Sequence, residues 1–221
     1  MENKDKVVVD LCGGSGNWSK FYDEAGYQVI NVDILYGLDV HHYIPPENVY
    51  GILSAPPCLE FSLARNGINK YMTEAPKRNL SAGMELVKTC QRIIDSCSPV
   101  FWVIENPTGL LRRFLGKPIY TFHPWQYGDP WTKRTDLWGK FNIPKPIYQS
   151  QQECLDNLGE PVTEYLRKQK ISPSIRKGKL LPSKADLDKT HFKYTGMRAE
   201  RSAFRAETPL GFARAFYEVN K

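Results

Sequence analysis

The chain has 221 residues, of which 41% are hydrophobic, and this is enough for one domain with its own core or one domain with a small appendage. The formal net charge of +6 at pH 7 favours a polyanionic partner. The five cysteines form no closely spaced pair, which argues against a zinc site and against a secreted disulfide framework.

Hydrophobic patterning predicts alternating strands and helices along the first half of the chain. In chain order we expect a strand over 6–11, a helix over 17–25, a strand over 27–33, a strand over 49–54, a helix over 81–94 and a strand over 99–105. Strands that alternate with helices indicate βαβ units. The predicted fold class is therefore α/β, with a parallel, Rossmann-like sheet that helices cover on both faces.

The second half of the chain has a different composition. Residues 166–205 contain twelve Lys or Arg and three acidic residues, which indicates a basic appendage or long basic loops; a solvated linker is the alternative. A final helix is predicted to begin at Thr208 or Pro209, with the threonine as its cap, and to end near Val219. We expect three regions: a core over 1–140, a basic recognition region over 141–204 and a C-terminal helix over 205–221 that returns to the core.

A glycine-rich turn follows the first predicted strand in the segment DLCGGSG. Glycines let a backbone turn sharply and approach a ligand closely. Asp33 ends the next strand, where its carboxylate could accept hydrogen bonds from ribose hydroxyls. The pair suits a cofactor that contains adenosine, without separating NAD from S-adenosylmethionine, and a plain tight turn is the alternative. Asp39 is a candidate adenine contact or an isolated surface acid.

Cys58 follows two prolines at the end of a predicted strand, in the segment SAPPCLEFS. Proline fixes φ and restricts the residue before it to an extended conformation, so Pro56 and Pro57 supply a rigid stem. A lone cysteine is more often a small buried apolar residue, and we interpret Cys90 and Cys97 in that way. The position of Cys58 at a strand end instead favours an aimed nucleophile.

Glu105 closes the apolar run VFWVIENP. A carboxylate at the end of a buried strand is partly desolvated and can hold or share a proton; the alternative is a carboxylate that caps a helix beginning at Thr108. A cysteine and a glutamate at neighbouring strand ends form a plausible nucleophile and acid pair.

In this order, DLCGGSG, Asp33, PPC and ENP resemble the motifs of the cytosine-C5 DNA methyltransferase family, especially its short phage-type members. The segments YGDPWTKRTDLWG (127–139) and RAETPLGFARAFYE (205–218) resemble two further segments of that family. The likeness covers about residues 6–139 and 205–218.

The resemblance implies that the Cys58 thiolate attacks C6 of a flipped cytosine in double-stranded DNA while Glu105 engages the ring N3 and the exocyclic amine. It implies S-adenosylmethionine as the cofactor that donates a methyl group to C5. The cofactor-binding residues that it implies are Asp10, Cys12, Gly13, Gly14, Gly16, Asp33, Ile34, Asp39 and Pro56.

Basic residues provide the expected DNA contacts. The loop 63–79 would close over the base with Arg65, Lys70, Lys77 and Arg78 near phosphates, and a solvated loop is the alternative. The chain departs from the family at 131–135, where a family arginine that meets the base aligns with Thr135. Arg134 is the candidate for that role, and Lys133 is assigned to DNA. Glu60 beside the nucleophile is a second departure.

The leading prediction is therefore a DNA (cytosine-5)-methyltransferase that acts as a monomer in the cytoplasm of a bacterial or phage-infected cell, with no membrane partner. One alternative is a catalytically silent DNA-binding protein on the same scaffold. Another is an enzyme that modifies RNA or uses a modified S-adenosylmethionine. A nicotinamide-dependent dehydrogenase is less favoured, because no hydride-transfer site accompanies the glycines.

Overall fold

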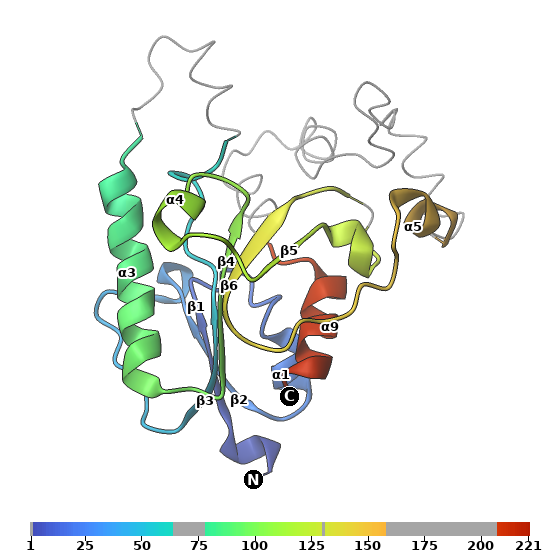
Figure 1. Cartoon of the computed structure of the whole chain (residues 1–221). Helices are drawn as coiled ribbons and strands as arrows, with labels where there is room; N and C mark the ends of the chain where they lie inside the picture. Colours follow the sequence, from blue (N-terminus) through green and yellow to red (C-terminus); the bar gives the residue numbers. More distant parts are fainter. Residues whose placement is uncertain (1, 64–77, 130, 158–206) are drawn as a thin grey trace, which may run out of the picture.

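The protein is an α/β structure built on one six-stranded mixed sheet with the strand order β2-β1-β3-β4-β6-β5 (Figure 1). The structure is a computed structural model, and it describes residues 2–63, 78–129, 131–157 and 207–221. This arrangement is compatible with a Rossmann-like fold.

Four neighbouring strands are parallel, as the sequence predicts. They are β1 (Val7–Leu11), β2 (Gln28–Val32), β3 (Val49–Ser54) and β4 (Phe101–Pro107). Because these strands are parallel, their carboxyl ends lie at the same edge of the sheet. That edge therefore carries the glycine-rich turn, the residue Asp33, the PPC segment and the ENP segment.

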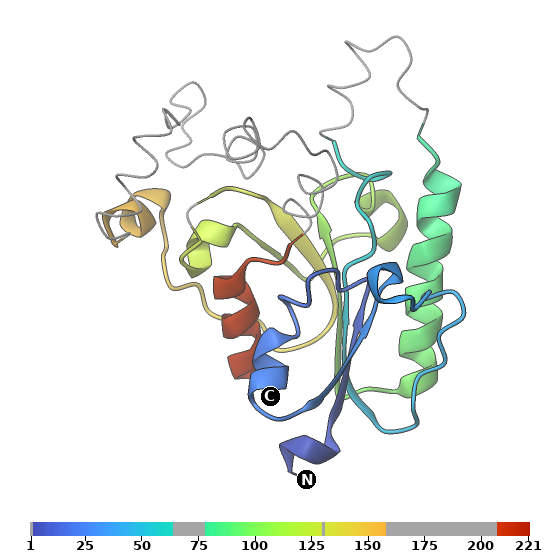
Figure 2. The same ribbon diagram turned by 180° about the vertical axis from the view of Figure 1, so that it is seen from behind.

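Helices cover both faces of the sheet, as predicted (Figures 1 and 2). Helix α3 (Leu80–Cys97) packs Cys90, Ile93 and Ile94 on one face, in a cluster with residues of β1, β3 and β4. Helices α1 (Lys20–Glu24) and α9 (Leu210–Val219) cover the opposite face. The alternation within β1 explains this division, since Val8 packs in one cluster while Val7 and Val9 pack in the other.

The last two strands differ from the prediction of a parallel sheet. Strand β6 (Thr135–Lys140) pairs antiparallel with β4, and β5 (Tyr120–Phe122) pairs antiparallel with β6. The sheet is mixed because the connection over 108–134, which contains α4, β5 and η3, returns to the carboxyl end of β4 and does not cross to its amino end. In this register Thr135 lies opposite Pro107, so the residues just before β6 arrive at the carboxyl end of β4.

A polar cluster fastens β6 to the segment after β4. The buried Asp136 carboxylate accepts hydrogen bonds from Arg112 at 2.6 Å, from Thr108 at 2.9 Å and from Thr121 at 2.8 Å. Burial alone would raise the pKa of Asp136, but the hydrogen bonds from Arg112, Thr121 and Thr108 outweigh it, and the pKa is lowered. The carboxylate therefore stays charged and holds the start of β6 in register.

Helix boundaries correct four expectations. The helix after β4 is α4 (Arg112–Leu115) and does not begin at Thr108, where the backbone N–H instead donates to the carbonyl oxygen of Arg134. Helix α1 is shorter than predicted, and α3 is longer. Thr208 does not cap α9: Pro209 is the N-cap residue, and no side chain caps the helix there.

Short elements complete the described chain: the 3-10 helices η1 (Asn3–Asp5), η2 (Ile34–Tyr36) and η3 (Pro124–Tyr127), and helix α5 (Gln151–Asn157). Helix α9 contacts both α1 and η3, and Phe212 stacks on Phe122 with 3.8 Å between the ring centroids. The C-terminal segment thus returns to the core. None of the described helices combines the length and apolar character needed to span a bilayer.

Candidate active site

The glycine turn, residues 12–16, reverses the chain immediately after β1. Cys12, Gly14 and Gly16 have φ angles of 57°, 53° and 73°. Positive φ is uncommon for a residue with a β-carbon, so Cys12 is a strained position at the start of the turn. The N–H of Cys12 donates to the carbonyl oxygen of Val32 at 2.8 Å, which ties the turn to the end of β2.

The thiol of Cys12 packs toward the core beside α3. It joins the cluster that contains Cys90, and the hydrogen bond with Cys90, together with burial, raises the pKa of the Cys12 thiol. The side chain therefore stays protonated and acts as a packing group. Its backbone is the part that shapes the turn.

Two polar side chains meet over Gly13. A β-carbon at this position would lie 2.5 Å from Cγ of Asp10 and 2.6 Å from Oδ1 of Asn31, so only glycine fits without moving them. The Oδ1 atoms of Asp10 and Asn31 are both buried without a hydrogen-bond partner. Oδ2 of Asp10 accepts from the Ser19 hydroxyl at 2.7 Å. Two acceptors without donors at a glycine turn form a cradle for a ligand that donates hydrogen bonds.

Burial raises the pKa of Asp10 to about 7, since desolvation outweighs the hydrogen bond from Ser19. The native state therefore binds more protons than the unfolded chain between about pH 4 and pH 7. Across that window the free energy of unfolding should fall as the pH rises, by at most about 1.4 kcal/mol for each pH unit. Above pH 7 this contribution is fully lost.

The variant Asp10→Asn should remove this pH dependence, because an amide does not titrate yet still accepts from Ser19. We expect the variant to gain stability relative to the wild type as the pH rises from 5 to 8. Urea unfolding at several pH values measures the difference, with Asp23→Asn, at an exposed position in α1, as the control. Parallel stability curves for Asp10→Asn and the wild type would contradict the prediction.

Asp33 lies directly after β2, as predicted, and its side chain contacts the glycine turn from the end of β2. Its carboxylate accepts from the N–H of Gly14 at 3.0 Å and from the N–H of Leu35 at 2.9 Å. The first bond joins β2 to the glycine turn, and the second caps η2. Asp39 is exposed and accepts from the N–H of His41 at 2.9 Å, so it stabilises a local turn.

An exposed apolar segment follows Asp33. Ile34, Leu35 and Tyr36 are 77%, 72% and 57% exposed. Large apolar side chains in a row beside the glycine turn provide a surface on which a planar, apolar group could pack.

The PPC segment continues from β3 at the same edge of the sheet. The N–H of Ala55 donates to the carbonyl oxygen of Leu11 at 2.9 Å, which places the PPC segment beside the glycine turn. The side chain of Asn106 donates to the carbonyl oxygen of Pro56 at 2.9 Å. The carbonyl oxygen of Cys58 accepts from the N–H groups of Phe61 and Ser62 at 3.0 and 2.8 Å, so Cys58 begins a tight turn.

The turn after Cys58 is anchored by close packing. Phe61 is fully buried, in a cluster with Val87 and Leu111. A β-carbon at Gly109 would lie within 2.3 Å of the Phe61 carbonyl oxygen, so glycine is needed where the segment after β4 crosses the turn. Both neighbouring segments therefore restrain the backbone that carries Cys58.

Glu60 links the turn after Cys58 to Arg78 and Asn79, the residues just before α3. Its carboxylate accepts from the N–H of Asn79 at 2.6 Å. Arg78 donates to the carbonyl oxygens of Glu60 at 2.5 Å and of Ser62 at 2.7 Å. The expected phosphate contact of Arg78 is untested, and the described contacts make it an anchor of the PPC turn.

At the carboxyl ends of β3 and β4, Lys133 pairs with Glu105, and the charges of both act on the Cys58 thiol. Glu105 is buried, and its Oε1 lies 3.8 Å from Nζ of Lys133, with the two side chains 11% and 14% exposed. Burial raises the pKa of the Cys58 thiol; the positive charge of Lys133 opposes this rise, and the negative charge of Glu105 adds to it. The thiol therefore lies within the electrostatic reach of both groups.

Of the two adjacent basic residues, Lys133 lies in the site and Arg134 has an exposed side chain. The backbone of Arg134 accepts from the N–H of Thr108 at 2.9 Å, which fixes the start of β6. Thr135, which aligns with the family arginine, is buried and donates its hydroxyl to the Lys133 carbonyl oxygen at 3.1 Å. This geometry favours Lys133 over Arg134 as the cation beside Glu105.

Several predicted DNA-binding residues lie outside the described residues. These are Arg65, Lys70 and Lys77, together with the basic segment 166–205. The expected closure of the loop over a base and the recognition role of the basic segment stay predictions.

Sequence reasoning did not select Asn31 or Asn106. Asn31 faces Gly13, and Asn106 holds the backbone of Pro56. The available signal was a polar residue inside an otherwise apolar strand, since a buried amide needs partners. Asn31 shows this signal in the segment YQVINVD. Asn106 shows it at the end of the apolar run VFWVIENP, where an asparagine also fits the end of a strand.

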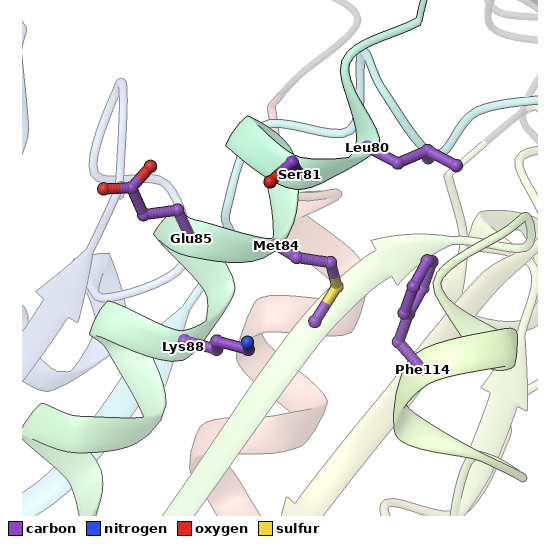
Figure 3. A pocket seen from close by; sticks show the side chains of 6 residues that line it. All are labelled: Leu80, Ser81, Met84, Glu85, Lys88 and Phe114. Atoms are coloured by element: carbon purple, nitrogen blue, oxygen red, sulfur yellow. The ribbon is translucent and has the colours of Figure 1, made fainter.

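A cavity of about 420 Å³ lies between α3 and α4, away from these residues. In Figure 3, Met84 of α3 and Phe114 of α4 face each other across it. None of the predicted catalytic or cofactor residues lines this cavity; its lining residues are Leu80, Ser81, Met84, Glu85, Lys88 and Phe114.

Comparisons with known proteins add no relative to this description. A scan against models of protein families matches none of them, and a search of curated proteins finds no match.

Proposed function

We propose that the protein is a DNA (cytosine-5)-methyltransferase that uses S-adenosylmethionine and a covalent Cys58 adduct. The observation that carries the proposal is that the PPC segment with Cys58 lies beside the glycine turn, at the sheet edge where Glu105 pairs with Lys133. A thiol, a carboxyl group and a cation at one sheet edge provide a nucleophile, a proton-holding group and a charge to stabilise the thiolate.

The residues around the glycine turn fit S-adenosylmethionine. The cradle over Gly13 presents two acceptors without donors, which suits the cofactor's ammonium group. The exposed segment from Ile34 to Tyr36 offers an apolar surface for adenine. Asp33 stands at the end of β2, where ribose hydroxyls would lie, although its oxygens already accept from two backbone N–H groups. When bound, the cofactor supplies an electrophilic methyl group attached to a sulfonium.

Cys58 and Glu105 perform the steps on the base. The C5 atom of cytosine is a weak nucleophile until C6 is saturated, so the Cys58 thiolate forms a bond to C6 while Glu105 holds a proton at N3. The electron pair released into the ring makes C5 nucleophilic toward the methyl group. Loss of the C5 proton afterwards restores the double bond and releases the thiolate.

The substrate must be DNA in which the base is turned out of the stack, because stacking hides C5 and C6 in a duplex. The net charge of +6 supports binding to the phosphate backbone. Cys58 begins a restrained turn at the carboxyl edge of the sheet and is partly exposed, which suits attack on a flipped base.

Transfer of a labelled methyl group from S-adenosylmethionine to DNA tests the proposal. Duplexes of varied sequence that contain 5-fluorocytosine should also become covalently attached to the protein in the presence of the cofactor, since the C5 fluorine cannot leave as a proton does. DNA binding with neither transfer nor adduct would favour the silent DNA-binding protein. Mass spectrometry of nucleosides from DNA and RNA would show an RNA substrate or a larger transferred group.

A further inference from the structure

We propose that Glu60 and Arg78 are positioning residues, which fasten the nucleophile turn (residues 58–62) to the N-terminus of α3 and so fix the place of Cys58 before a substrate binds. The catalytic consequence of this role rests on the proposed function. The attachment itself consists of hydrogen bonds within the protein, so it can be measured without DNA or cofactor.

The N-terminus of α3 is capped from two segments of the chain. Asn79 is the N-cap residue, and its side chain accepts from the N–H of Ala82 at 3.0 Å. The carboxylate of Glu60 accepts from the N–H of Asn79 at 2.6 Å. In a capping box this second bond comes from the residue three positions after the N-cap, but that residue is Ala82, whose side chain has no acceptor. Glu60 supplies the bond from the nucleophile turn, where its charge also suits the helix dipole.

Arg78, one residue before the cap, holds the backbone of the same turn. Its guanidinium donates to the carbonyl oxygens of Glu60 at 2.5 Å and of Ser62 at 2.7 Å. A guanidinium can serve two acceptors at once, and bonds from a charged donor are stronger than bonds between neutral groups. The carbonyl oxygen of Phe61, between them, accepts from the N–H of Leu110 at 2.9 Å. Three consecutive carbonyl groups of the nucleophile turn are therefore held, from the start of α3 and from the segment after β4.

Close packing at Gly83 supports the same attachment. A β-carbon at Gly83 would lie 3.0 Å from Cβ of Glu60 and 3.0 Å from Cζ of Phe61. Glycine is disfavoured within a helix relative to alanine, so the close approach of the nucleophile turn explains why glycine stands here in α3. Phe61 is also buried in a cluster with Val87, one helical turn further on. The nucleophile turn and the first turns of α3 thus form one packed unit.

The place of the thiol depends on this unit. The carbonyl oxygen of Cys58 accepts from the N–H groups of Phe61 and Ser62, so a movement of those two residues also moves the backbone of Cys58. A nucleophile must lie about 3–3.5 Å from the atom that it attacks, in the right orientation. By limiting the movement of the turn, Glu60 and Arg78 hold the thiol in a position from which attack is possible.

Hydrogen exchange of backbone amides tests the attachment. It is measured by peptide mass spectrometry on the full chain without DNA or cofactor, for the wild type, Arg78→Met, Glu60→Ala and Glu60→Gln. Arg92→Met, at an exposed position of α3, is the matched control. Exchange in β1 is followed at the same time, since a change there would reveal global unfolding and a change confined to residues 58–62 would not.

We expect Arg78→Met and Glu60→Ala to accelerate exchange in the nucleophile turn by about tenfold, which is the effect of losing one hydrogen bond. Glu60→Gln should stay within about threefold of the wild type, because its amide oxygen still accepts from the N–H of Asn79. Exchange in β1 should be unchanged in every variant, and Arg92→Met should match the wild type throughout. If Arg78→Met fails to fold, Arg78→Lys replaces it, because an ammonium group lacks the fork that serves two carbonyl groups.

The kinetics of methyl transfer test the positioning role. Arg78→Met and Glu60→Ala should lower the turnover rate by about ten- to a hundredfold, because a displacement of about 1 Å can have that effect. The KM for S-adenosylmethionine should not change, since the residues assigned to the cofactor lie outside the nucleophile turn. Glu60→Gln should keep the turnover rate of the wild type.

Three results would overturn the inference. The first is exchange in the nucleophile turn that stays at the wild-type rate in both Arg78→Met and Glu60→Ala. The second is faster exchange with full turnover. The third is a higher KM for DNA in Arg78→Met with an unchanged turnover rate, which would favour a phosphate contact for Arg78. Faster exchange in these variants of a protein whose wild type transfers no methyl group would instead support the attachment and contradict the proposed function alone.

Discussion

Cys58→Ser should reduce methyl transfer to DNA by about a thousandfold or more and should abolish the covalent adduct with 5-fluorocytosine DNA. A serine hydroxyl at the same place has nearly the same size, so the restrained turn after β3 should be preserved. Its oxygen stays protonated at neutral pH, however, and a hydroxyl is a far weaker nucleophile than a thiolate. The loss should therefore appear in the turnover rate while DNA binding is retained.

Cys97→Ser is the matched control for this experiment. Cys97 is the last residue of α3 and comes just before β4 begins at Phe101, so it lies near the amino edge of the sheet and not at the carboxyl edge. The Cys97→Ser variant also replaces sulfur by oxygen, but outside the site, so we expect it to keep the full methyl-transfer activity of the wild type. Methyl transfer that survives undiminished in Cys58→Ser would rule out the covalent mechanism.

Gly211→Ala should destabilise the protein by about 1–3 kcal/mol, in the range of overpacked cores. A β-carbon at Gly211 would lie within 2.0 Å of the Tyr127 carbonyl oxygen and 2.9 Å from Oδ2 of Asp129. The N–H of Gly211 donates to the same carboxylate oxygen at 3.0 Å, which holds α9 against η3. Helix α9 must move away to accept the methyl group, and its movement separates Phe212 from Phe122.

Helix propensity alone predicts the opposite sign for this variant, because alanine is favoured over glycine in a helix by about 1 kcal/mol. Chemical denaturation of Gly211→Ala and of Leu210→Ala, a change at the neighbouring exposed position, separates the two effects. We expect Leu210→Ala to change stability by less than about 0.5–1 kcal/mol. A Gly211→Ala protein as stable as the wild type would show that α9 does not pack against η3 in this way.

Local patterns in the sequence predict most of the sheet. The four parallel strands are confirmed, and β3 has the predicted bounds. The inner strands β1 and β3 are largely buried and are short runs of mainly apolar residues, whereas the edge strand β2 is only partly buried. The predicted position of Asp33, directly after a strand, is also confirmed, since β2 ends at Val32.

Contacts between distant segments were not predictable in this way. The antiparallel β6 has buried polar residues at Thr135 and Asp136, which obscure the pattern of a strand. The buried Asp136 carboxylate accepts hydrogen bonds from Arg112, Thr108 and Thr121, which come from other segments. The sequence therefore could not choose between Lys133 and Arg134.

The sequence by itself determined the parallel core of the sheet and the order of the groups at its carboxyl edge, from the glycine turn to Cys58 and Glu105. These features depend on hydrophobic periodicity and on backbone restrictions within a few residues. Only the tertiary structure decided that Lys133 pairs with Glu105, that Asn31 meets Asp10 over Gly13, and that Glu60 is a structural anchor beside Arg78. Each of these depends on the register and pairing of segments far apart in the chain, which local patterns do not encode.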